Sequence, residues 1–354
     1  MINLQTYEQI DRAEWAALVQ SSSTGTWFQT PEAFDFFASM PELFTPFAFG
    51  LINHQSPITN HQSPLKGVCC GYVTVEKSTL KQFLTRRAII IGGPCLANDA
   101  TDEEVYTLMN AVAETLRRPI TDYQSPITFT SPIYIETRNF NDYSCWKKSF
   151  ASAGFAYVPH LNFHVDTSSP EIVETNLGKS RKRDIRTTIR EGVTIVEHPT
   201  DQQVCEYYAI LEQLYKTRVK TPLFPLSFFL NLNRHKDARF LLTELNGKII
   251  GGTVCVEQQG KCLYEWFACG EDGVYPHVFP SCYATYAGIR YAAEHNCSRF
   301  DMMGAGKPDE AYGVRDFKAK FGGKEVEYGR YVCVTKPLLY KFGVLGVKIL
   351  KKIK

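Results

Sequence analysis

The alternation of hydrophobic and polar positions predicts the same succession of elements twice along the chain. The first half predicts strands over 46–52, 67–75 and 87–92, a helix over 102–117, a strand over 132–137, a helix over 143–153 and a strand over 157–166. The second half predicts strands over 238–245, 248–256 and 261–269, a helix over 280–295, a strand over 299–303, a helix over 313–321 and a strand over 326–334. Helical segments precede each copy, at 8–20 and 31–39 and at 202–216 and 225–233. The order β-β-β-α-β-α-β therefore indicates an internal duplication.

This repetition predicts an α/β (α+β) protein of two tandem domains, each a mixed central sheet flanked by helices. A length of 354 residues also suits two domains. We place the first domain at 1–166, a basic linker helix at 167–192, the second domain at 193–335 and a basic amphipathic helix at 336–354. The tandem heptad at 53–65 is rich in Asn, Ser and Pro and predicts an exposed loop insertion rather than a histidine site.

Composition narrows the function by exclusion. The net charge is +2, so any argument for a nucleic acid or a membrane has to come from a local patch. The eleven cysteines show no C-x-x-C spacing, and we expect no metal. The N-terminus lacks the pattern of a signal peptide, and no apolar run is long enough to span a bilayer. These features predict a cytoplasmic protein, with peripheral membrane association as an addition.

The segment with the strongest chemical pattern runs from Arg299 to Gly323. Gly304 and Gly306 follow a predicted strand and allow the backbone to approach a ligand closely. The next helix would offer free N–H groups, and Arg315 and Lys318 lie three residues apart on one face of it. Asp301 and Glu265 are acidic candidates for a general base. The alternative is an ordinary Gly-rich turn followed by solvated cations.

A second basic segment covers 179–190. At helical spacing its cations fall in one stripe, which consists of Lys179, Lys182, Arg183, Arg186 and Arg190. Ile185 and Ile189 occupy the adjoining face, which is the face expected to pack. Such a stripe suits the phosphates of a nucleotide diphosphate, a lipid-linked pyrophosphate or an RNA backbone, and a merely solvated face is the alternative.

Two further features leave alternatives open. Tyr264 and Trp266 lie on a predicted strand and would line a substrate cleft or belong to the core. The segment 337–354 places apolar residues at helical spacing among lysines and contains no acid. It would lie on an anionic membrane surface or pack on its own domain with a Lys-rich end.

The residues 300–306 and 313–323 resemble the Fem (FemABX) family, as do the helix at 280–293 and the basic segment at 177–192. The resemblance implies two GNAT-like domains and the transfer of an amino acid from aminoacyl-tRNA to a peptidoglycan precursor. It assigns Lys318 to stabilisation of the transition state. By position, Arg181, Lys182, Arg183 and Arg186 would contact precursor or tRNA phosphates. The chain lacks the coiled-coil arm of several members, which bears on the tRNA-facing role.

The partners implied are a nucleotide- or lipid-linked cell-wall precursor and a tRNA. We expect no cofactor, with aminoacyl-tRNA as co-substrate and acyl-CoA as the alternative donor. Neither copy contains the R/Q-x-x-G-x-G/A loop with which ordinary GNAT enzymes bind CoA, which favours the aminoacyl donor. A third possibility, from another class, is a non-catalytic module that docks through the basic stripe on an anionic lipid or polymer.

Overall fold

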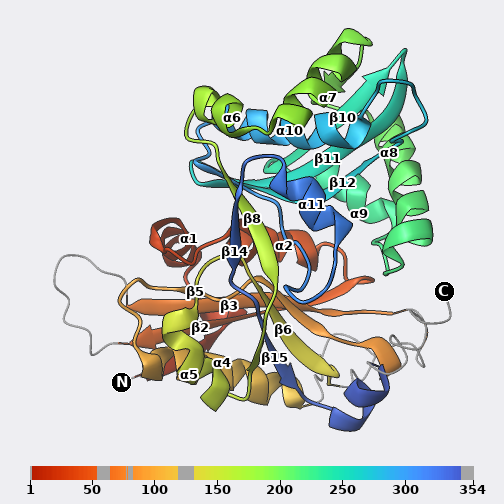
Figure 1. The fold of residues 1–354 in the computed structure, drawn as a ribbon. Coiled ribbons are helices and arrows are strands. Elements are labelled where there is room, and N and C mark those ends of the chain that lie inside the picture. Colours follow the sequence, from red (N-terminus) through yellow and green to blue (C-terminus); the bar gives the residue numbers. More distant parts are fainter. Residues whose placement is uncertain (1, 54–63, 77, 79–82, 119–130, 344–354) are drawn as a thin grey trace. The chain divides into compact units, whose positions relative to one another are not determined.

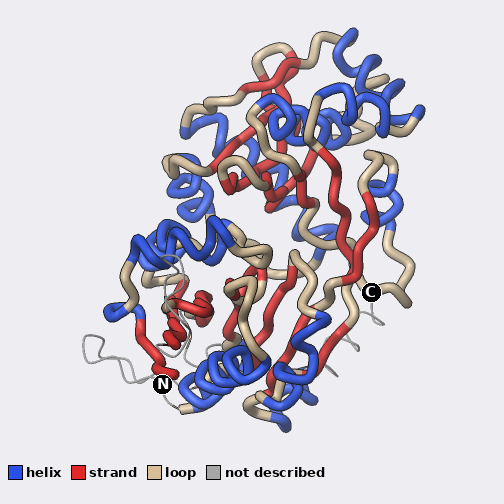
Figure 2. The backbone as a smooth tube through the Cα atoms, turned by 90° about the vertical axis from the view of Figure 1, so that its left-hand side faces the viewer, coloured by secondary structure: helices blue, strands red, loops and turns tan. Residues whose placement is uncertain are grey.

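The chain forms two units, each built on its own sheet. The computed structural model describes residues 2–53, 64–76, 78, 83–118 and 131–343. Unit 1 comprises Met1–Pro159 and Tyr328–Lys354, and unit 2 comprises His160–Glu327. Figure 1 labels the elements of both units, and Figure 2 shows helices against the strands in each of them.

Unit 1 contains a mixed sheet. Its strand order is β1 (Ile2–Thr6), β2 (Phe44–Asn53), β3 (Leu65–Thr74), β4 (Ala88–Gly92), β6 (Tyr134–Asn139), β15 (Arg330–Val334) and β7 (Ala156–Val158), with β5 (Cys95–Leu96) beside β3. Among these described strands, only β4 and β6 pair in parallel. The helices are α1 (Arg12–Ser21), α2 (Pro31–Ala38), α4 (Asp102–Arg117) and α5 (Lys147–Ser152). A capping box between Thr101 and Glu104 starts α4, whose apolar face packs on β2 and β3.

Unit 2 repeats this plan. Its strand order is β14 (Lys324–Glu327), β8 (Leu161–Asp166), β13 (Arg299–Asp301), β12 (Cys262–Gly270), β11 (Lys248–Gln258), β10 (Ala238–Leu245) and β9 (Thr194–Val196). Here β12 and β13 form the parallel pair. The helices are α6 (Pro170–Asn176), α7 (Lys179–Arg190), α8 (Asp201–Leu214) with a π-helical turn at Tyr215–Val219, α9 (Leu226–Asn233), α10 (Pro280–Glu294) and α11 (Gly313–Ala319). The core joins α10 and α7 to β8 and β13 through side chains such as Ile289, Ile185 and Phe300.

The two units exchange one strand each: a strand that directly follows one unit along the chain pairs in the sheet of the other unit. β8 follows β7 along the chain but pairs with β13 and β14 in unit 2. β15 follows β14 but pairs with β6 and β7 in unit 1. The two single strands expected at 157–166 and 326–334 are therefore four short ones. Pro159 breaks the first because it has no N–H for a ladder, and Gly329 breaks the second with a φ of +63°.

The structure confirms the fold class of two tandem mixed sheets flanked by helices. It divides the chain differently from the sequence, because β8 adds 160–166 to unit 2 and β15 adds 328–335 to unit 1. The segment expected as a linker helix forms α6 and α7 within unit 2. Of the expected loop insertion, 54–63 lies outside the described residues, and of the C-terminal helix only 337–343 is described, as helical.

The described residues include no helix that is long and apolar enough to cross a membrane. Within the same residues, no group of three or more His, Cys, Asp or Glu side chains is arranged to hold a metal ion. All eleven cysteines are free thiols and most are buried, as their apolar surroundings in the sequence predict.

Candidate active site

The parallel strands β12 and β13 stop pairing partway along β12. Their register runs from Cys262 opposite Arg299 to Tyr264 opposite Asp301, where β13 ends, while β12 continues to Gly270. On the other side of β12, Val254 faces Phe267 and Cys255 faces Glu265, so Trp266 is the extra residue of a β-bulge. A bulge bends its strand and re-aims the side chains next to it. We call the point just past Tyr264 and Asp301, where the two strands part, the fork.

A tight loop at 302–307 follows β13. Met303, Gly304 and Gly306 have positive φ values of +51°, +108° and +79°. The value at Gly304 lies beyond the left-handed helical region that other residues adopt, so this position favours glycine on backbone grounds. At Gly306 a Cβ would lie 2.8 Å from the ring of Tyr312, so close approach of the chain adds a second reason.

The N–H groups of this loop are bonded within unit 2. Met303 N donates to Asp301 Oδ1 at 2.8 Å, Gly304 N to Asn162 Oδ1 at 2.8 Å and Ala305 N to Leu161 O at 2.7 Å. The sequence predicted free N–H groups near 304–313, between the Gly-x-Gly turn and the start of the next helix, as donors to an oxyanion. These three N–H groups are instead used to fasten the loop to β8 and β13.

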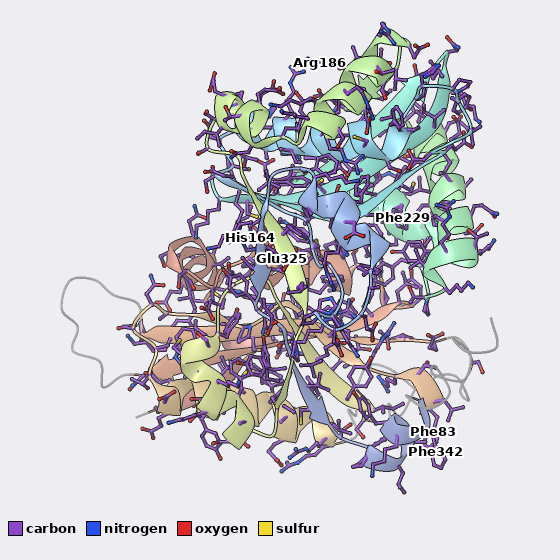
Figure 3. All side chains as sticks on the ribbon, viewed as in Figure 1. Phe83, His164, Arg186, Phe229, Glu325 and Phe342 are labelled. Atoms are coloured by element: carbon purple, nitrogen blue, oxygen red, sulfur yellow. The ribbon has the colours of Figure 1, made fainter. Side chains whose placement is uncertain are left out.

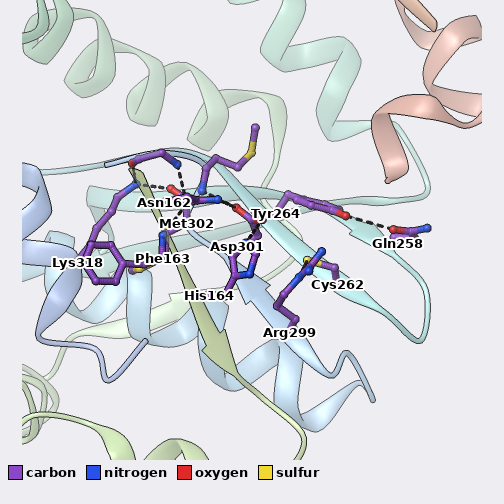
Figure 4. A network of polar contacts seen from close by, with 12 residues as sticks. Asn162, Phe163, His164, Gln258, Cys262, Tyr264, Arg299, Asp301, Met302 and Lys318 are labelled. Carbon is purple, nitrogen blue, oxygen red and sulfur yellow. Dashed lines mark hydrogen bonds and ion pairs between the residues drawn. The ribbon is translucent and has the colours of Figure 1, made fainter. Parts of the chain in front are cut away.

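The carbonyl groups of the loop receive the two cations of α11. Lys318 Nζ donates to Gly304 O at 2.8 Å and to Met302 O. Arg315 Nε donates to Ala305 O at 3.1 Å, and its Nη2 donates to Lys307 O. The predicted spacing thus brings both cations to one loop, as Figure 4 shows for Lys318. An ammonium has three N–H donors, so one N–H of Lys318 remains for a ligand.

The amine of Lys318 lies in a partly buried, acidic environment. Burial lowers its pKa, and the carboxylates of Glu265 and Asp301 oppose that effect. Glu265 is the first residue of β12 beyond the paired segment, and burial raises its pKa. Its Oε1 accepts from Thr285 Oγ1 at 2.8 Å, and Thr253 Oγ1 lies 3.2 Å away. Lys318 is therefore close to Glu265 and to Met302, which are the first residues past the last β12–β13 pair on the two strands.

Asp301 holds the loop at its first residues, because its Oδ1 accepts from Met303 N. It is fully buried, its Oδ1 accepts from Asn162 Nδ2 at 2.7 Å, and its Oδ2 lies 3.0 Å from His164 Nε2. Burial alone would raise the pKa of Asp301, but His164, Arg299 and Asn162 outweigh burial and lower it. Bonds run from His164 through Asp301, Asn162 and Gly304 to Lys318 (Figure 4).

Sequence reasoning missed Asn162 and His164. Both lie on β8, which the sequence had placed at the end of the first domain. A signal was present, since polar Asn162, His164 and Asp166 alternate with apolar residues along this strand. That alternation predicts a polar face, but it does not say which sheet the strand joins.

The aromatic candidates have different environments. Tyr264 is completely buried, and its hydroxyl lies 3.2 Å from Gln258 Oε1, which is the core position that the sequence left as an alternative. Trp266 is partly exposed and packs edge-on against Phe228, with ring centroids 5.3 Å apart. Trp266 also forms the bulge that β12 adds to the fork, and its place in the lining of a cleft stays a prediction.

The basic segment separates into a buried residue and an exposed stripe. Arg181 is buried, with its guanidinium 4.4 Å from the ring centroid of Phe317, and it holds α11 against α7. Lys179, Arg183, Arg186 and Arg190 are exposed and Lys182 is partly exposed, so these five residues form the predicted stripe. Arg186 lies on the outer side of α7 (Figure 3). Ile185 packs as expected, whereas Ile189 is exposed because Thr188 takes the inward position.

Comparisons with known proteins agree with this architecture. Residues 179–318, which end at Lys318, match the family model described as an acetyltransferase (GNAT) domain. The crystal structure of FemX aligns with a TM-score of 0.68 at 11% identity, covering 96% of this chain and 99% of FemX. No curated protein matches in sequence.

Two further structures align over nearly the whole chain. One is the C-terminal domain of a putative lysylphosphatidylglycerol synthetase from Agrobacterium fabrum, with a TM-score of 0.53 and 13% identity over 96% of this chain and 95% of that one. The other is a tandem GNAT protein from the clavulanic acid biosynthesis pathway, with a TM-score of 0.53 and 9% identity over 95% and 99%. The chain therefore has a tandem GNAT fold. Within that class its fold is Fem-like, and the fork with Lys318 falls inside the matched GNAT region.

Proposed function

We propose that the protein is a Fem-like transferase that adds an amino acid from aminoacyl-tRNA to an amine of a peptidoglycan or other cell-envelope precursor. The observation that carries the proposal is the position of Lys318. Its amine lies beside the fork of β12 and β13, is held by two loop carbonyls and keeps one N–H for a ligand. The GNAT-domain match and the Fem-like fold support transferase chemistry at this place.

The proposed reaction forms one C–N bond and breaks one C–O bond. The neutral amine of the acceptor attacks the ester carbonyl of the aminoacyl donor, and negative charge develops on the carbonyl oxygen. The charged Lys318 would donate its remaining N–H to that oxygen. The amine then loses a proton and the departing ribose hydroxyl gains one, so the overall proton count is unchanged.

The two acidic candidates have different roles in this proposal. A carboxyl whose pKa is raised is suited to accepting and returning a proton, and Glu265 has that property beside Lys318. Asp301 was expected to be catalytic, but its pKa is lowered and both of its oxygens face partners. We assign Asp301 and Arg315 to positioning of the loop.

The start of α10 supports an aminoacyl donor over acyl-CoA. A pyrophosphate bound at a helix N-terminus needs free N–H groups and an absence of negative charge. At α10 the carboxylate of Asp272 already accepts from Ser281 N at 3.2 Å, and Thr188 Oγ1 accepts from Phe279 N at 3.0 Å. Pro280, the first residue of the helix, has no N–H.

Acyl-CoA-dependent N-acyltransfer to an envelope or polysaccharide precursor is the second candidate. The observation in its favour is the family match itself, whose description is of an acetyltransferase domain. In that reaction Lys318 would have the same task, because the tetrahedral intermediate of a thioester also carries an oxyanion. The donor alone separates the two candidates.

The donor can be tested by two measurements on the full chain. Isothermal titration with acetyl-CoA should give no heat of binding if the donor is an aminoacyl ester. In parallel, a mixture of tRNAs charged with radiolabelled amino acids is incubated with a nucleotide-linked muropeptide or its lipid-linked form. We expect label in the precursor with the wild type and a loss of transfer with Lys318→Met. Tight acetyl-CoA binding together with acetyl transfer would replace the proposal by the second candidate.

A further inference from the structure

Two segments of unit 1 that are distant in sequence expose large apolar side chains. Phe83 and Leu84 are 45% and 49% exposed, and Leu338 and Phe342 are 74% and 70% exposed. Among the described residues, Leu338 and Phe342 are the most exposed of the large apolar side chains. We call these four residues the apolar patch; Figure 3 labels Phe83 and Phe342.

Contacts around the start of β6 hold the two segments together. Ile133 N donates to Arg86 O at 2.8 Å, and Lys336 N donates to Ile133 O at 3.1 Å. The Lys336 amine lies 5.3 Å from the ring centroid of Phe83. The apolar patch is therefore one surface, because the segments at 83–86 and 336–342 both attach to the backbone of Ile133.

The helix at 337–343 presents its expected apolar face outward. Tyr340 packs edge-on against Tyr134, with ring centroids 5.5 Å apart, and Leu339 is also partly buried. Leu338 and Phe342, four residues apart and predicted as one face, point away from unit 1 together with Lys341. Packing of this face on its own domain was one of the two expectations from the sequence, and the described residues do not pack it.

The sequence that begins beside the apolar patch carries charge of one sign. The stretch 336–354 contains Lys336, Lys341, Lys348, Lys351, Lys352 and Lys354 and no Asp or Glu. The whole chain has a net charge of only +2, so this run of lysines is a local property of the sequence. Exposed aromatic and aliphatic side chains among lysines are the composition with which helices bind the interface of an anionic bilayer.

We propose that the apolar patch docks the protein on the surface of an anionic lipid bilayer. The four apolar side chains enter the interface, and Lys336 and Lys341 contact the headgroups, with their aliphatic stems against the acyl region. A second copy of the chain is a poorer occupant. A two-fold contact places the same patch on both sides and so brings lysines against lysines. This proposal does not depend on the transferase chemistry.

The test is co-sedimentation of the full chain with phosphatidylcholine vesicles that either contain or lack phosphatidylglycerol. We expect binding to the anionic vesicles, weakened by salt, and little binding to neutral ones. Leu338→Ser with Phe342→Ser should weaken binding by about tenfold for each side chain, from the lost apolar transfer. Phe83→Ser should weaken it in the same direction. The matched control is Val274→Ser, an exposed apolar residue of unit 2, which should bind like the wild type.

Each other outcome contradicts the proposal. If the wild type ignores anionic vesicles, or the double variant binds as well as the wild type, the apolar patch is not the docking surface. If the double variant melts several degrees lower than the wild type, other residues of the chain pack on these side chains. If the wild type is a dimer in gel filtration and the double variant a monomer that still binds vesicles, a second copy is the occupant.

Discussion

The corresponding regions of the two units differ just where the proposed chemistry lies. In unit 1 the parallel pair stays in register from Ala88 opposite Ile135 to Gly92 opposite Asn139, where both strands end. In unit 2 the pairing ends at Tyr264 and Asp301 while β12 runs on. In unit 1 the chain is interrupted at Gly93 and Pro94 before β5 continues beside β3, and the Tyr143 hydroxyl donates to carbonyls at this interruption. In unit 2, β12 runs on past the fork as one unbroken strand. We place the proposed ligand site in unit 2 because of this difference between the two copies.

The helices that follow β6 and β13, which are α5 and α11, also differ in whether they bring a lysine to the end of the strand pair. The sequences at 146–150 and 317–321 correspond when Phe150 is aligned with Phe321, which pairs Lys147 of α5 with Lys318 of α11. Lys147, however, is exposed, and its amine lies 5.1 Å from the ring centroid of Tyr157. Phe150 and Tyr143 fill the space below α5, and the Tyr143 hydroxyl donates to Pro94 O at 2.7 Å. The stretch 140–143, which is described throughout, has no positive φ, in contrast with 303–306. Unit 1 uses this region for its core.

The largest effect is expected when the two equivalent lysines are compared. Lys318→Met should lower kcat about a hundredfold to a thousandfold, as removal of an oxyanion donor does. Lys147→Met, the matched change in unit 1, should leave kcat unchanged. Steady-state transfer assays on both variants give the comparison, and melting temperatures show that each is folded. Equal losses in the two variants would remove the distinction between the units.

Arg315→Met separates chemistry from loop holding. Arg315 and Lys318 both donate to carbonyls of the 302–307 loop. If Lys318 acts only by holding this loop, Arg315→Met should reduce kcat as much as Lys318→Met. We expect a clearly smaller loss, measured with the same substrates.

The next largest effect concerns the network that connects β8 to the loop. Asn162→Ala removes the acceptor of Gly304 N and the donor to Asp301. We expect a loss of about tenfold to a hundredfold in kcat, because small misplacement of reacting groups is costly, and about 1–3 kcal/mol in stability. Asn139→Ala is the control, since Asn139 is a buried amide of unit 1 that donates to Tyr328 O at 3.0 Å. It should lower stability similarly and spare kcat.

A smaller effect is expected on stability at acid pH. The folded-state pKa values of Asp301 and of Glu136, a buried carboxylate on β6 of unit 1, are both lowered. The stabilisation from each is therefore present above the unfolded pKa, about 4, and is lost as pH falls through the folded value. Asp301→Asn and Glu136→Gln should each lower the melting temperature at neutral pH, and the deficits should shrink below about pH 4. If the melting temperature of Asp301→Asn stays below that of the wild type by the same amount at every pH, the ionised form of Asp301 is not what stabilises the fold.

The smallest effect on turnover is expected from the exposed stripe of α7. Arg183→Ala with Arg186→Ala should raise KM and reduce the salt dependence of KM, while kcat stays within about twofold, because exposed cations act through long-range attraction. Lys147→Ala with Lys148→Ala is the matched double change in unit 1 and should alter neither parameter. If the stripe variant instead abolishes all ligand binding and Lys318→Met has no effect, the protein is a binding module.

The duplicated order and most element positions could be predicted from the sequence, because period and turn residues are local signals. The helix at Asp102–Arg117 shows this best, since its apolar spacing and capping box lie within its own sequence. The cluster of Gly304, Gly306, Arg315 and Lys318 could be predicted for the same reason. Their positions along one strand–turn–helix bring them together.

The strand exchange could not be predicted from these signals. Nothing in the alternation at 161–166 distinguishes pairing with β6 from pairing with β13, since both offer an apolar neighbour. Because the partner of this strand could not be predicted, the place of Asn162 and His164 in the site could not be predicted either. The direction of the loop N–H groups depends on the same strand, because Asn162 and Leu161 are their acceptors. The pairing of β8 with β13, two strands far apart in sequence, therefore determines which N–H groups of the loop are already bonded.

The role of Lys318 is tested most directly by a crystal structure of the protein with a non-hydrolysable amide analogue of 3′-aminoacyl-adenosine. We expect the carbonyl oxygen of the analogue to lie about 3 Å from Lys318 Nζ, beside Met302 and Glu265 in unit 2. An analogue bound in unit 1 instead, either beside Lys147 or at the end of β4 and β6, would contradict the assignment of the chemistry to the fork.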